Sequence, residues 1–257
     1  MTLELLVAEL GPGARGGFTT RAGGVSAPPW AAADGSGGLN LAFHTDDDPD
    51  RVMANRDILG RALGARVAWV SQRHGAGVRV VDRVMGAGRT SLGTADVVVA
   101  DARASADPLA VAVMVADCVP LLLAGRDGRV AAAVHVGRGG LVRGAVAAAL
   151  DALAARGAPA ADLYASIGPS ICGRCYEVPA GLRDEVDALV PGTATRTAWG
   201  TPSLDIAAGV RAQLRSAGVT RLQHHDACTR EDERFYSFRR DGVTGRCAGV
   251  VRAGDTP

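Results

Sequence analysis

The sequence predicts one domain of the α/β or α+β class, and three observations support this class. Short apolar runs rich in β-branched residues recur along the chain, as expected of buried strands. Stretches with apolar residues at the 3.6-residue period of a helix lie between them. No internal repeat, linker-like change of composition or low-complexity block divides residues 1–257, and 47% of them are apolar, which is ample for one large core.

The strands are predicted from apolar runs bounded by glycine, proline or polar residues. In chain order they are residues 3–10, 67–70, 78–81, 95–100, 109–124, 130–135 and 163–167, with a last strand ending at residue 251. Asp117 and Cys118 interrupt the run 109–124. Residues 18–26, 27–39 and 85–93 are predicted to be loops, and residues 252–257 a frayed tail.

A helix is predicted to begin at Pro49, because Asp48 suits the N-cap and proline suits the first helical position. Gly64 is a natural stop for this helix. Further helices are expected at residues 141–155, 182–190 and 205–216. The last of these is expected to be capped by Ser203 or Asp205.

The charges nearly balance, with 28 basic and 27 acidic residues, so no strong field attracts nucleic acid or an anionic membrane. Every basic residue is arginine, which excludes lysine Schiff-base chemistry. The first residues lack a basic signal region, and no apolar run reaches the length of about 18 residues that a membrane helix needs. We therefore expect a soluble, cytoplasmic protein with no evident protein partner.

His74, Cys118 and His135 each follow or end a predicted strand. Polar groups at the ends of buried strands need partners, because an unpaired buried charge or donor is costly. Two imidazoles and one thiolate suit Zn²⁺ and leave a fourth position for water, which then loses a proton near neutral pH. For each residue taken alone, a structural role in the core is the simpler interpretation. Without a metal, Cys118 could instead be a nucleophile with His135 as its base.

The five cysteines are odd in number and suggest free thiols or ligands rather than a disulfide framework. Cys172-Gly-Arg-Cys175 is a Cys-x-x-Cys pair that could be half of a zinc site, but no second pair completes it. Small residues at a tight turn explain the pair at least as well. The roles of Cys172, Cys175, Cys228 and Cys247 therefore stay open.

A set of ordered motifs runs along nearly the whole chain. They are Thr20-Arg21-Ala-Gly-Gly-Val-Ser26, Asn40-Leu-Ala-Phe-His44, Asn55-Arg56, Gln72-Arg-His74-Gly75, Ala116-Asp117-Cys118-Val-Pro120, His135-Val-Gly137, Gly168-Pro-Ser-Ile, Cys175-Tyr-Glu177-Val, Cys228-Thr229, Phe235-Tyr-Ser-Phe-Arg239-Arg240 and Thr244-Gly-Arg246. In this order they resemble the laccase-domain (multicopper polyphenol oxidase-like) purine nucleoside phosphorylases. The resemblance implies a mixed β-sheet sandwich flanked by helices, and it places the family's zinc ligands on His74, Cys118 and His135.

The resemblance also implies phosphorolysis of adenosine, inosine and S-methyl-5′-thioadenosine, with inorganic phosphate as co-substrate, and deamination of adenosine. Zn²⁺ is the expected cofactor, and copper is less favoured because four-copper oxidation needs many more histidines than five. In deamination, Asp117 or Glu177 would move protons. The candidates for substrate binding are Arg21, Asn40, Gln72, Arg239 and Arg240, since guanidinium groups match phosphate; surface solvation explains Arg239 and Arg240 about as well.

One departure from the family pattern affects the expected substrate. Where the family has His-Ala-Gly-Trp-Arg-Gly, this chain places Arg138 at the tryptophan position and Gly139 at the arginine position. Arg138 could replace the arginine from the neighbouring position, or the activity is weak or shifted. Three alternatives stay open: a metal-free cysteine hydrolase using Cys118 and His135, a peptidoglycan-precursor editing enzyme, and a metal-binding protein without turnover.

Overall fold

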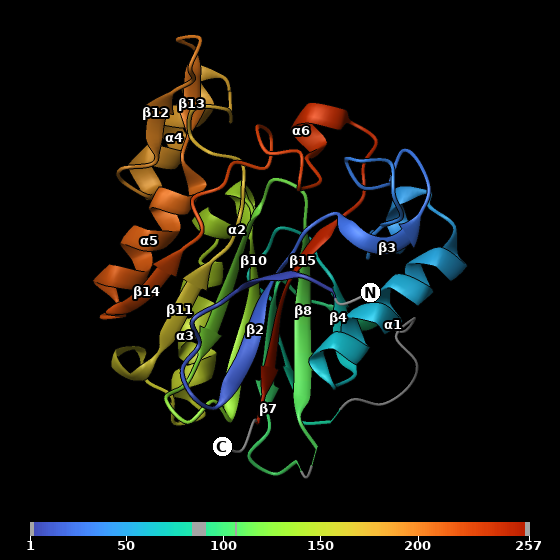
Figure 1. The fold of residues 1–257 in the computed structure, drawn as a ribbon. Coiled ribbons are helices and arrows are strands. Elements are labelled where there is room, and N and C mark those ends of the chain that lie inside the picture. The colour runs from blue at the N-terminus through green and yellow to red at the C-terminus, as the bar shows by residue number, and fades with distance from the viewer. Residues whose placement is uncertain (1–2, 84–90, 106, 255–257) are drawn as a thin grey trace.

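The computed structural model describes residues 3–83, 91–105 and 107–254. Two six-stranded sheets pack face to face, and helices cover their outer faces (Figure 1). This arrangement confirms the expected mixed α/β sandwich flanked by helices. Across the described ranges, no helix combines the length and apolar character needed to cross a bilayer.

The first sheet has the strand order β1-β2-β15-β8-β4-β6. Its strands are β1 (Leu5–Val7), β2 (Ala14–Thr19), β15 (Cys247–Ala253), β8 (Leu109–Val115), β4 (Val67–Ser71) and β6 (Ser91–Thr94). The first four pair antiparallel, whereas β4 lies parallel to both of its neighbours. The late strand β15 therefore lies in the interior of this sheet, between β2 and β8.

The second sheet has the order β14-β11-β9-β10-β7-β5. Its strands are β14 (Arg221–His224), β11 (Tyr164–Ile167), β9 (Val119–Ala124), β10 (Val130–Val136), β7 (Val97–Asp101) and β5 (Val78–Val81). The two strands at each edge pair parallel and the central ones pair antiparallel. Outside both sheets lie β3 (Ala22–Ser26) and the hairpin of β12 (Ala194–Arg196) and β13 (Pro202–Leu204).

The alternation of side chains along the strands produces three apolar layers. In β8, Leu109, Val111 and Val113 point between the two sheets, and the intervening residues point toward α1 (Pro49–Leu63). The strand is apolar throughout because both of its faces are covered. This double burial explains why 109–115 reads as one continuous apolar run.

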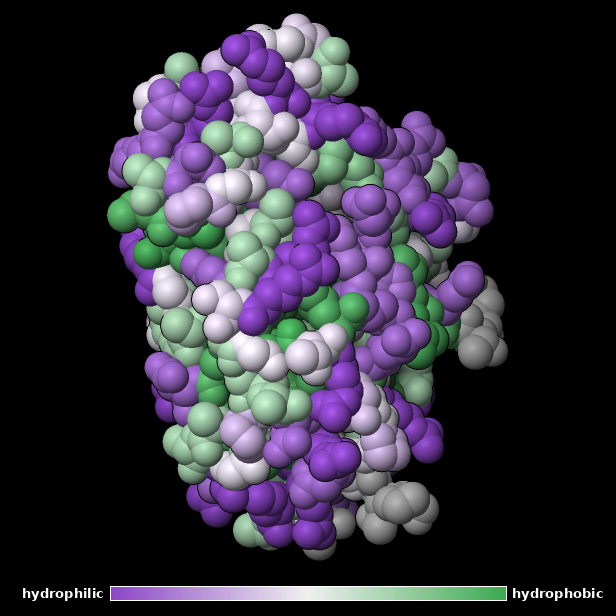
Figure 2. Space-filling view, turned by 90° about the vertical axis from the view of Figure 1, so that its left-hand side faces the viewer, coloured by the Kyte–Doolittle hydropathy of each residue, from purple (hydrophilic) through white to green (hydrophobic). Residues whose placement is uncertain are grey.

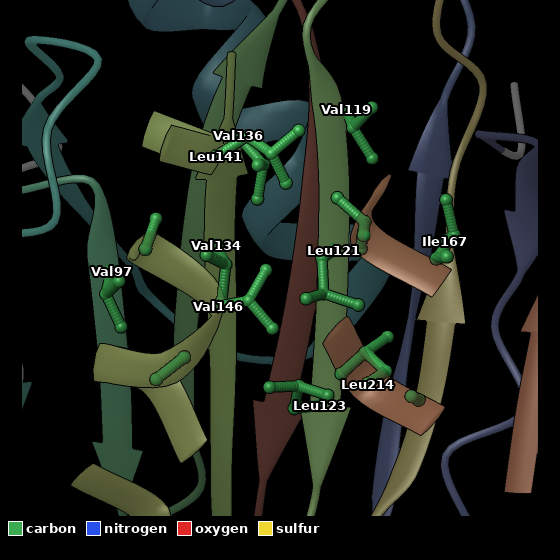
Figure 3. Close-up of a cluster of buried hydrophobic side chains, with 14 of the residues drawn as sticks. Val97, Val119, Leu121, Leu123, Val134, Val136, Leu141, Val146, Ile167 and Leu214 are labelled. Atoms are coloured by element: carbon green, nitrogen blue, oxygen red, sulfur yellow. The ribbon is translucent and has the colours of Figure 1, made fainter. Parts of the chain in front are cut away.

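The outer face of the second sheet packs against helices. Val134 of β10 and Leu121 of β9 contact a layer that includes Val146 and Leu214 (Figure 3). The helices on this side are α2 (Arg138–Val142), α3 (Ala145–Ala154), α4 (Ala180–Leu189) and α5 (Ile206–Ser216), and α6 (Phe238–Asp241) lies near the end of the sandwich. The molecular face turned toward the viewer in Figure 2 mixes hydrophilic and hydrophobic residues over its whole height.

The helix ends follow the predicted capping chemistry. Asp48 accepts a hydrogen bond from the Asp50 backbone N–H, and Gly64 adopts a left-handed conformation (φ 61°), which confirms both ends of α1. At α5 the cap is Asp205, which accepts from the Ala208 backbone N–H.

The structure corrects four local predictions. The helix predicted at 141–155 is two helices, α2 and α3, because Gly144 takes a left-handed conformation between them (φ 82°). The loop predicted at 85–93 is wrong for residues 91–93, which belong to β6; residues 85–90 lie outside the described residues. The frayed tail predicted at 252–257 is wrong for residues 252 and 253, which belong to β15 and pair with β8. Residues 255–257 lie outside the described residues.

The fourth correction concerns residues 18–26, which form the end of β2 and the strand β3 rather than a loop. A Cβ at Gly24 of β3 would collide with the Gly38 carbonyl oxygen, so neighbouring backbones approach too closely there for a side chain. Glycine carries no hydropathy signal, and this is why the apolar pattern missed the strand.

Candidate functional site

The ends of four strands from both sheets meet at the end of the sandwich that carries α2 and α6. β4, β8 and β10 end there, and β15 begins there. A pocket of about 860 Å³ opens between them, a volume typical of small-molecule sites (roughly 300–1,000 Å³). A larger hollow of about 1070 Å³ beside β1 and β14 contains none of the predicted site residues.

The structure brings His74, Cys118 and His135 together in this pocket. His74 follows β4, Cys118 lies between β8 and β9, and His135 is the penultimate residue of β10, just before α2. The His74 Nε2 lies 3.6 Å from the Cys118 Sγ, and one donor atom from each of the three residues lies within 4.8 Å of the others. Two imidazoles and a thiol at this spacing fit a divalent cation such as Zn²⁺ with a further position open to the pocket.

Asp96 holds both histidines of the triad through hydrogen bonds to its carboxylate. Its carboxylate accepts a 2.8 Å hydrogen bond from the His135 Nδ1 and further bonds from the backbone N–H groups of Arg73, His74 and Gly75. Burial opposes its charge, but these bonds prevail and lower the pKa of Asp96 to about 2. Because the Nδ1 of His135 is hydrogen-bonded to Asp96, its Nε2 is the nitrogen that can bind a metal.

Sequence reasoning did not assign Asp96 to the site. The only signal was an acidic residue at the start of the predicted strand 95–100. Its side chain contacts His135 because β7 and β10 pair antiparallel, with the His135 N–H donating to the Asp96 carbonyl oxygen. Strand pairing of this kind was not predictable from the local pattern.

Two features show how tightly the backbone is fitted around the triad. His74 and Asp117 adopt left-handed conformations (φ 58° and 88°), which are uncommon for residues other than glycine. A Cβ at Gly137 would lie 2.5 Å from the His74 Cδ2 and 3.0 Å from the Cys118 Sγ. Only glycine at position 137 therefore leaves room for these two side chains.

The partly exposed Cys118 and the buried His135 stabilise each other's charged forms. Burial disfavours charge on both, but His135 and His74 together lower the pKa of the Cys118 thiol to about 6. The Cys118 thiolate and the Asp96 carboxylate raise the pKa of His135 to about 9. Each group therefore favours the charged form of the other when no cation is bound.

Asp117 lines the pocket, but its carboxylate binds the loop before β15. Its Oδ1 accepts from the Thr229 and Ser237 hydroxyls, at 2.6 and 2.7 Å, and its Oδ2 accepts from the Arg239 backbone N–H. The Glu177 carboxylate lies outside the lining residues and accepts from the Trp199 indole N–H. Of the two carboxylates predicted to move protons, only that of Asp117 belongs to a residue that lines the pocket.

The predicted substrate-binding residues also separate into two groups. Gln72 and Arg239 line the pocket, although both ends of the Gln72 amide bond the Met114 backbone. Arg21, Asn40 and Arg240 lie outside the lining residues. Arg21 donates to the Ala31 carbonyl oxygen, Arg240 donates to carbonyl oxygens of its own loop, and Asn40 is fully buried.

Arg246 lines the pocket and was not predicted as a site residue. It directly precedes β15, and its backbone N–H donates to the buried Asn40 side chain. Burial and the charges of Arg246, Arg56 and Arg73 lower the pKa of His44, another lining residue. Arginines outnumber acidic residues in the pocket lining, and this excess of positive charge suits an anion.

Aromatic rings complete the pocket. Phe43, Trp69, Tyr176 and Phe238 are among its lining residues. The Arg239 guanidinium lies over the Tyr176 ring, 5.1 Å from its centroid, and donates to the Glu177 carbonyl oxygen. Planar rings beside guanidinium groups suit a ligand with one flat and one anionic part.

The structure also bears on the Arg138-Gly139 departure. A Cβ at Gly139 would lie 2.4 Å from an Nη atom of Arg143, and this guanidinium donates to the His74 carbonyl oxygen. Arg143 thus occupies the space beside residue 139, while Arg138 lines the pocket.

The sequence profile of one protein family matches residues 15–253, and its description is multi-copper polyphenol oxidoreductase laccase. A Streptomyces coelicolor protein named purine nucleoside phosphorylase is 48% identical over 242 residues, covering 93% of this chain and 95% of that protein. A Pseudomonas aeruginosa protein of the same name is 38% identical, covering 91% and 90% of the two chains.

Solved structures share the fold. A Neisseria meningitidis crystal structure superposes with a TM-score of 0.81 at 31% identity, covering 97% of this chain and 99% of that one. The YlmD structure from Geobacillus stearothermophilus gives a TM-score of 0.81 at 30% identity, with coverage of 94% and 92%.

Proposed function

The chain belongs to the multi-copper polyphenol oxidoreductase laccase family, and from this premise we propose that it is a zinc-dependent purine nucleoside phosphorylase built as a single domain. The observation that carries the proposal is the cluster of His74, Cys118 and His135 at the base of a pocket lined by arginines and aromatic rings. The name shared by the Streptomyces and Pseudomonas relatives supports the reaction class.

The pocket provides complementary groups for both parts of a nucleoside reaction. The flat purine packs against aromatic rings such as Tyr176, and phosphate binds near Arg239 and Arg246. In phosphorolysis a phosphate oxygen attacks C1′ of the ribose while the bond from C1′ to the purine nitrogen breaks. The arginines hold the attacking phosphate and balance its charge. Adenosine, inosine and S-methyl-5′-thioadenosine are the proposed substrates.

The triad residues fit Zn²⁺ by the chemistry of their donors, and copper is the less favoured ion. When bound there, the cation supplies a Lewis acid beside the substrate. Asp96 fixes the tautomer and orientation of His135, and Gly137 keeps the space between His74 and Cys118 free. These residues determine whether the three donors converge.

Adenosine deamination is proposed as a second reaction of the same pocket, in which water replaces the amino group at C6 and ammonia leaves. Asp117 is the better placed of the two candidate proton carriers, since it neighbours Cys118 and lines the pocket. Its carboxylate must exchange one of three accepted hydrogen bonds to take part. Glu177 is tied to Trp199 and would need to turn away from it.

A metal-free cysteine hydrolase is the second candidate, and one observation favours it. The Cys118 Sγ lies 3.6 Å from the His74 Nε2, and the two imidazoles of His74 and His135 lower the pKa of the thiol, an arrangement that a cysteine nucleophile also uses. This enzyme would keep full activity after chelation and lose it on thiol alkylation. The phosphorylase would lose activity on chelation and regain it when Zn²⁺ is restored.

The test compares wild type with Cys118→Ala and with Cys247→Ala, which removes a buried thiol outside the triad. Metal content and turnover are measured with adenosine, inosine and S-methyl-5′-thioadenosine, with and without phosphate. We expect Cys118→Ala to lose triad zinc and turnover, and Cys247→Ala to keep both. Unchanged zinc and turnover in Cys118→Ala would contradict the proposal.

A further inference from the structure

A second cluster of soft donors lies outside the pocket and independent of the proposed reaction. Donor atoms of Cys172, Cys175, Cys228 and Glu231 all lie within 4.8 Å of one another. Cys175 and Cys228 are buried, Cys172 is partly buried, and Glu231 is exposed. None of the four lines the pocket. All five cysteines of the chain are free thiols in this structure.

The cluster is assembled from two segments that are held together by backbone hydrogen bonds. Ser170 and Cys228 form a parallel bridge: the Ser170 N–H donates to the Ala227 carbonyl oxygen, and the Thr229 N–H donates to the Ser170 carbonyl oxygen. This backbone pairing places Cys228 beside the turn formed by residues 172–175. The missing partner of the Cys-x-x-Cys pair comes from a segment more than fifty residues away.

The Cys-x-x-Cys segment folds as a tight turn that brings its two thiols to one side. The N–H groups of Cys175 and Tyr176 both donate to the Cys172 carbonyl oxygen, at 2.9 and 3.0 Å. The Cys172 N–H points at the Cys228 Sγ, 3.4 Å away. This N–H favours a thiolate at Cys228. The three cysteines also pack against Ile171 and Tyr176, so the cluster combines soft donors with an apolar surround.

Glu231 closes the fourth side. Its Oε1 lies 3.3 Å from the Cys175 Sγ, and its Oε2 pairs with Arg174 at 3.5 Å. The neighbouring Arg230 lies over the Trp199 ring and also interacts with Cys175. Three thiolates and a carboxylate around a divalent cation carry a net negative charge, and these two arginines offset it.

We propose that Cys172, Cys175, Cys228 and Glu231 form a second, structural metal site that binds a divalent cation with an affinity for thiolates, Zn²⁺ foremost. Four donors of this kind match the closed tetrahedral sites that Zn²⁺ occupies in structural roles. With Zn–S bonds of about 2.3 Å, tetrahedral geometry places sulfurs about 3.8 Å apart. The donors already lie within 4.8 Å and need only a small contraction.

The bound cation ties the 170–178 segment to the 227–240 segment. Thr229, next to Cys228, donates to the Asp117 carboxylate, and the same segment supplies Ser237 and Arg239 to it. The second site thereby stabilises one wall of the pocket without contacting substrate. Its effect is expected in stability more than in turnover.

The first experiment measures zinc per chain in protein purified under reducing conditions without chelator. Wild type is expected to hold two equivalents, one per cluster. Cys172→Ser alters the partly buried ligand and is expected to lose one equivalent and melt at lower temperature, whereas the control Cys247→Ser keeps both. His135→Ala is expected to lose the other equivalent only.

These variants separate this site from the triad. If wild type holds one equivalent that Cys172→Ser removes and His135→Ala keeps, the second site stands and the triad proposal fails. If Cys172→Ser and a Cys172→Ser/Cys228→Ser double variant keep wild-type zinc and melting temperature, the second site is overturned.

Cobalt substitution identifies the ligands directly. Sulfur-to-Co²⁺ charge-transfer absorption grows with the number of thiolates, so most of its intensity is expected to disappear in Cys172→Ser/Cys228→Ser and little in Cys118→Ala. Thiol titration of the unfolded, metal-free chain should count five free thiols. A count of three would indicate a disulfide in the cluster and would overturn the proposal.

Discussion

The two donor clusters of this protein differ in number, origin and surroundings. The triad draws three donors from the ends of strands in both sheets and faces a pocket of about 860 Å³. The second cluster draws four donors from two loop segments and faces no part of that pocket. Catalytic zinc sites keep one position open and structural sites close all four. The comparison teaches that the setting of a cluster, more than its residue types, indicates its role.

The largest expected effect comes from Gly137→Ala, which breaks the triad alone. The added Cβ would lie 2.5 Å from the His74 Cδ2, so the imidazole must move. We expect loss of triad zinc and a roughly 10³-fold fall in kcat/KM, since a Lewis acid contributes several kcal/mol. Zinc at the second cluster should remain. The control is Gly181→Ala in α4, where a Cβ meets nothing within 4 Å; equal activity of the two variants would refute the prediction.

Asp96→Asn is expected to lower metal affinity or activity by about 10–100-fold, the usual effect of removing a group that orients a metal-binding histidine. The pKa of Asp96, lowered to about 2, adds a signature in stability. The charged carboxylate stabilises the fold fully above the unfolded pKa of about 4, and this contribution disappears as the pH falls toward 2. Acid unfolding curves should show that loss in wild type and in a control variant of an exposed aspartate of α3, Asp151→Asn, and it should be absent from Asp96→Asn.

Arg239→Ala is expected to raise the KM for phosphate by about tenfold, because a charge-assisted hydrogen bond contributes about 1.5–3 kcal/mol. The control is Arg234→Ala, whose guanidinium pairs with Asp232 at the surface. Steady-state kinetics with phosphate varied at saturating nucleoside check this. An unchanged KM for phosphate would contradict the prediction and would mean that phosphate does not bind at Arg239 of α6.

The smallest expected effect is that of Glu231→Gln at the second cluster. Loss of one ligand charge should lower the melting temperature by about 2–4 °C, equivalent to roughly 1 kcal/mol in a chain of this size, with turnover within about twofold of wild type. Glu233→Gln, a nearby exposed glutamate, is the matched control. A fall in turnover well beyond twofold, at a temperature where the variant is still folded, would mean that the two clusters are not separate in function.

Helix α1, strand β8 and the candidate triad were predictable because their signals are local. Asp48, Pro49 and Gly64 mark both ends of α1 by capping chemistry alone. The continuous apolar run of β8 follows from burial on both faces. His74, Cys118 and His135 stood out because each is a polar residue at the end of such a run, and the ordered motifs then supplied the family.

The remaining features depend on strand and loop pairing across long separations. Asp96 reaches His135 through the register of β7 and β10, and Cys228 reaches Cys172 through the Ser170 bridge. Neither contact has a signature in either segment alone. Arg21 and Arg240 belong to arginine-rich motifs, yet their guanidinium groups bond backbone carbonyls, and only coordinates distinguish such arginines from those facing an anion.

The interior position of β15 has a consequence for biosynthesis. This strand joins β2 to β8 in the first sheet, and Arg246 just before it lines the pocket. Until residues 247–253 have left the ribosome, the amino-terminal hairpin has no partner at that edge and the pocket lacks a wall. A nascent chain therefore cannot complete this pocket before β15 has been synthesised and has paired with β2 and β8.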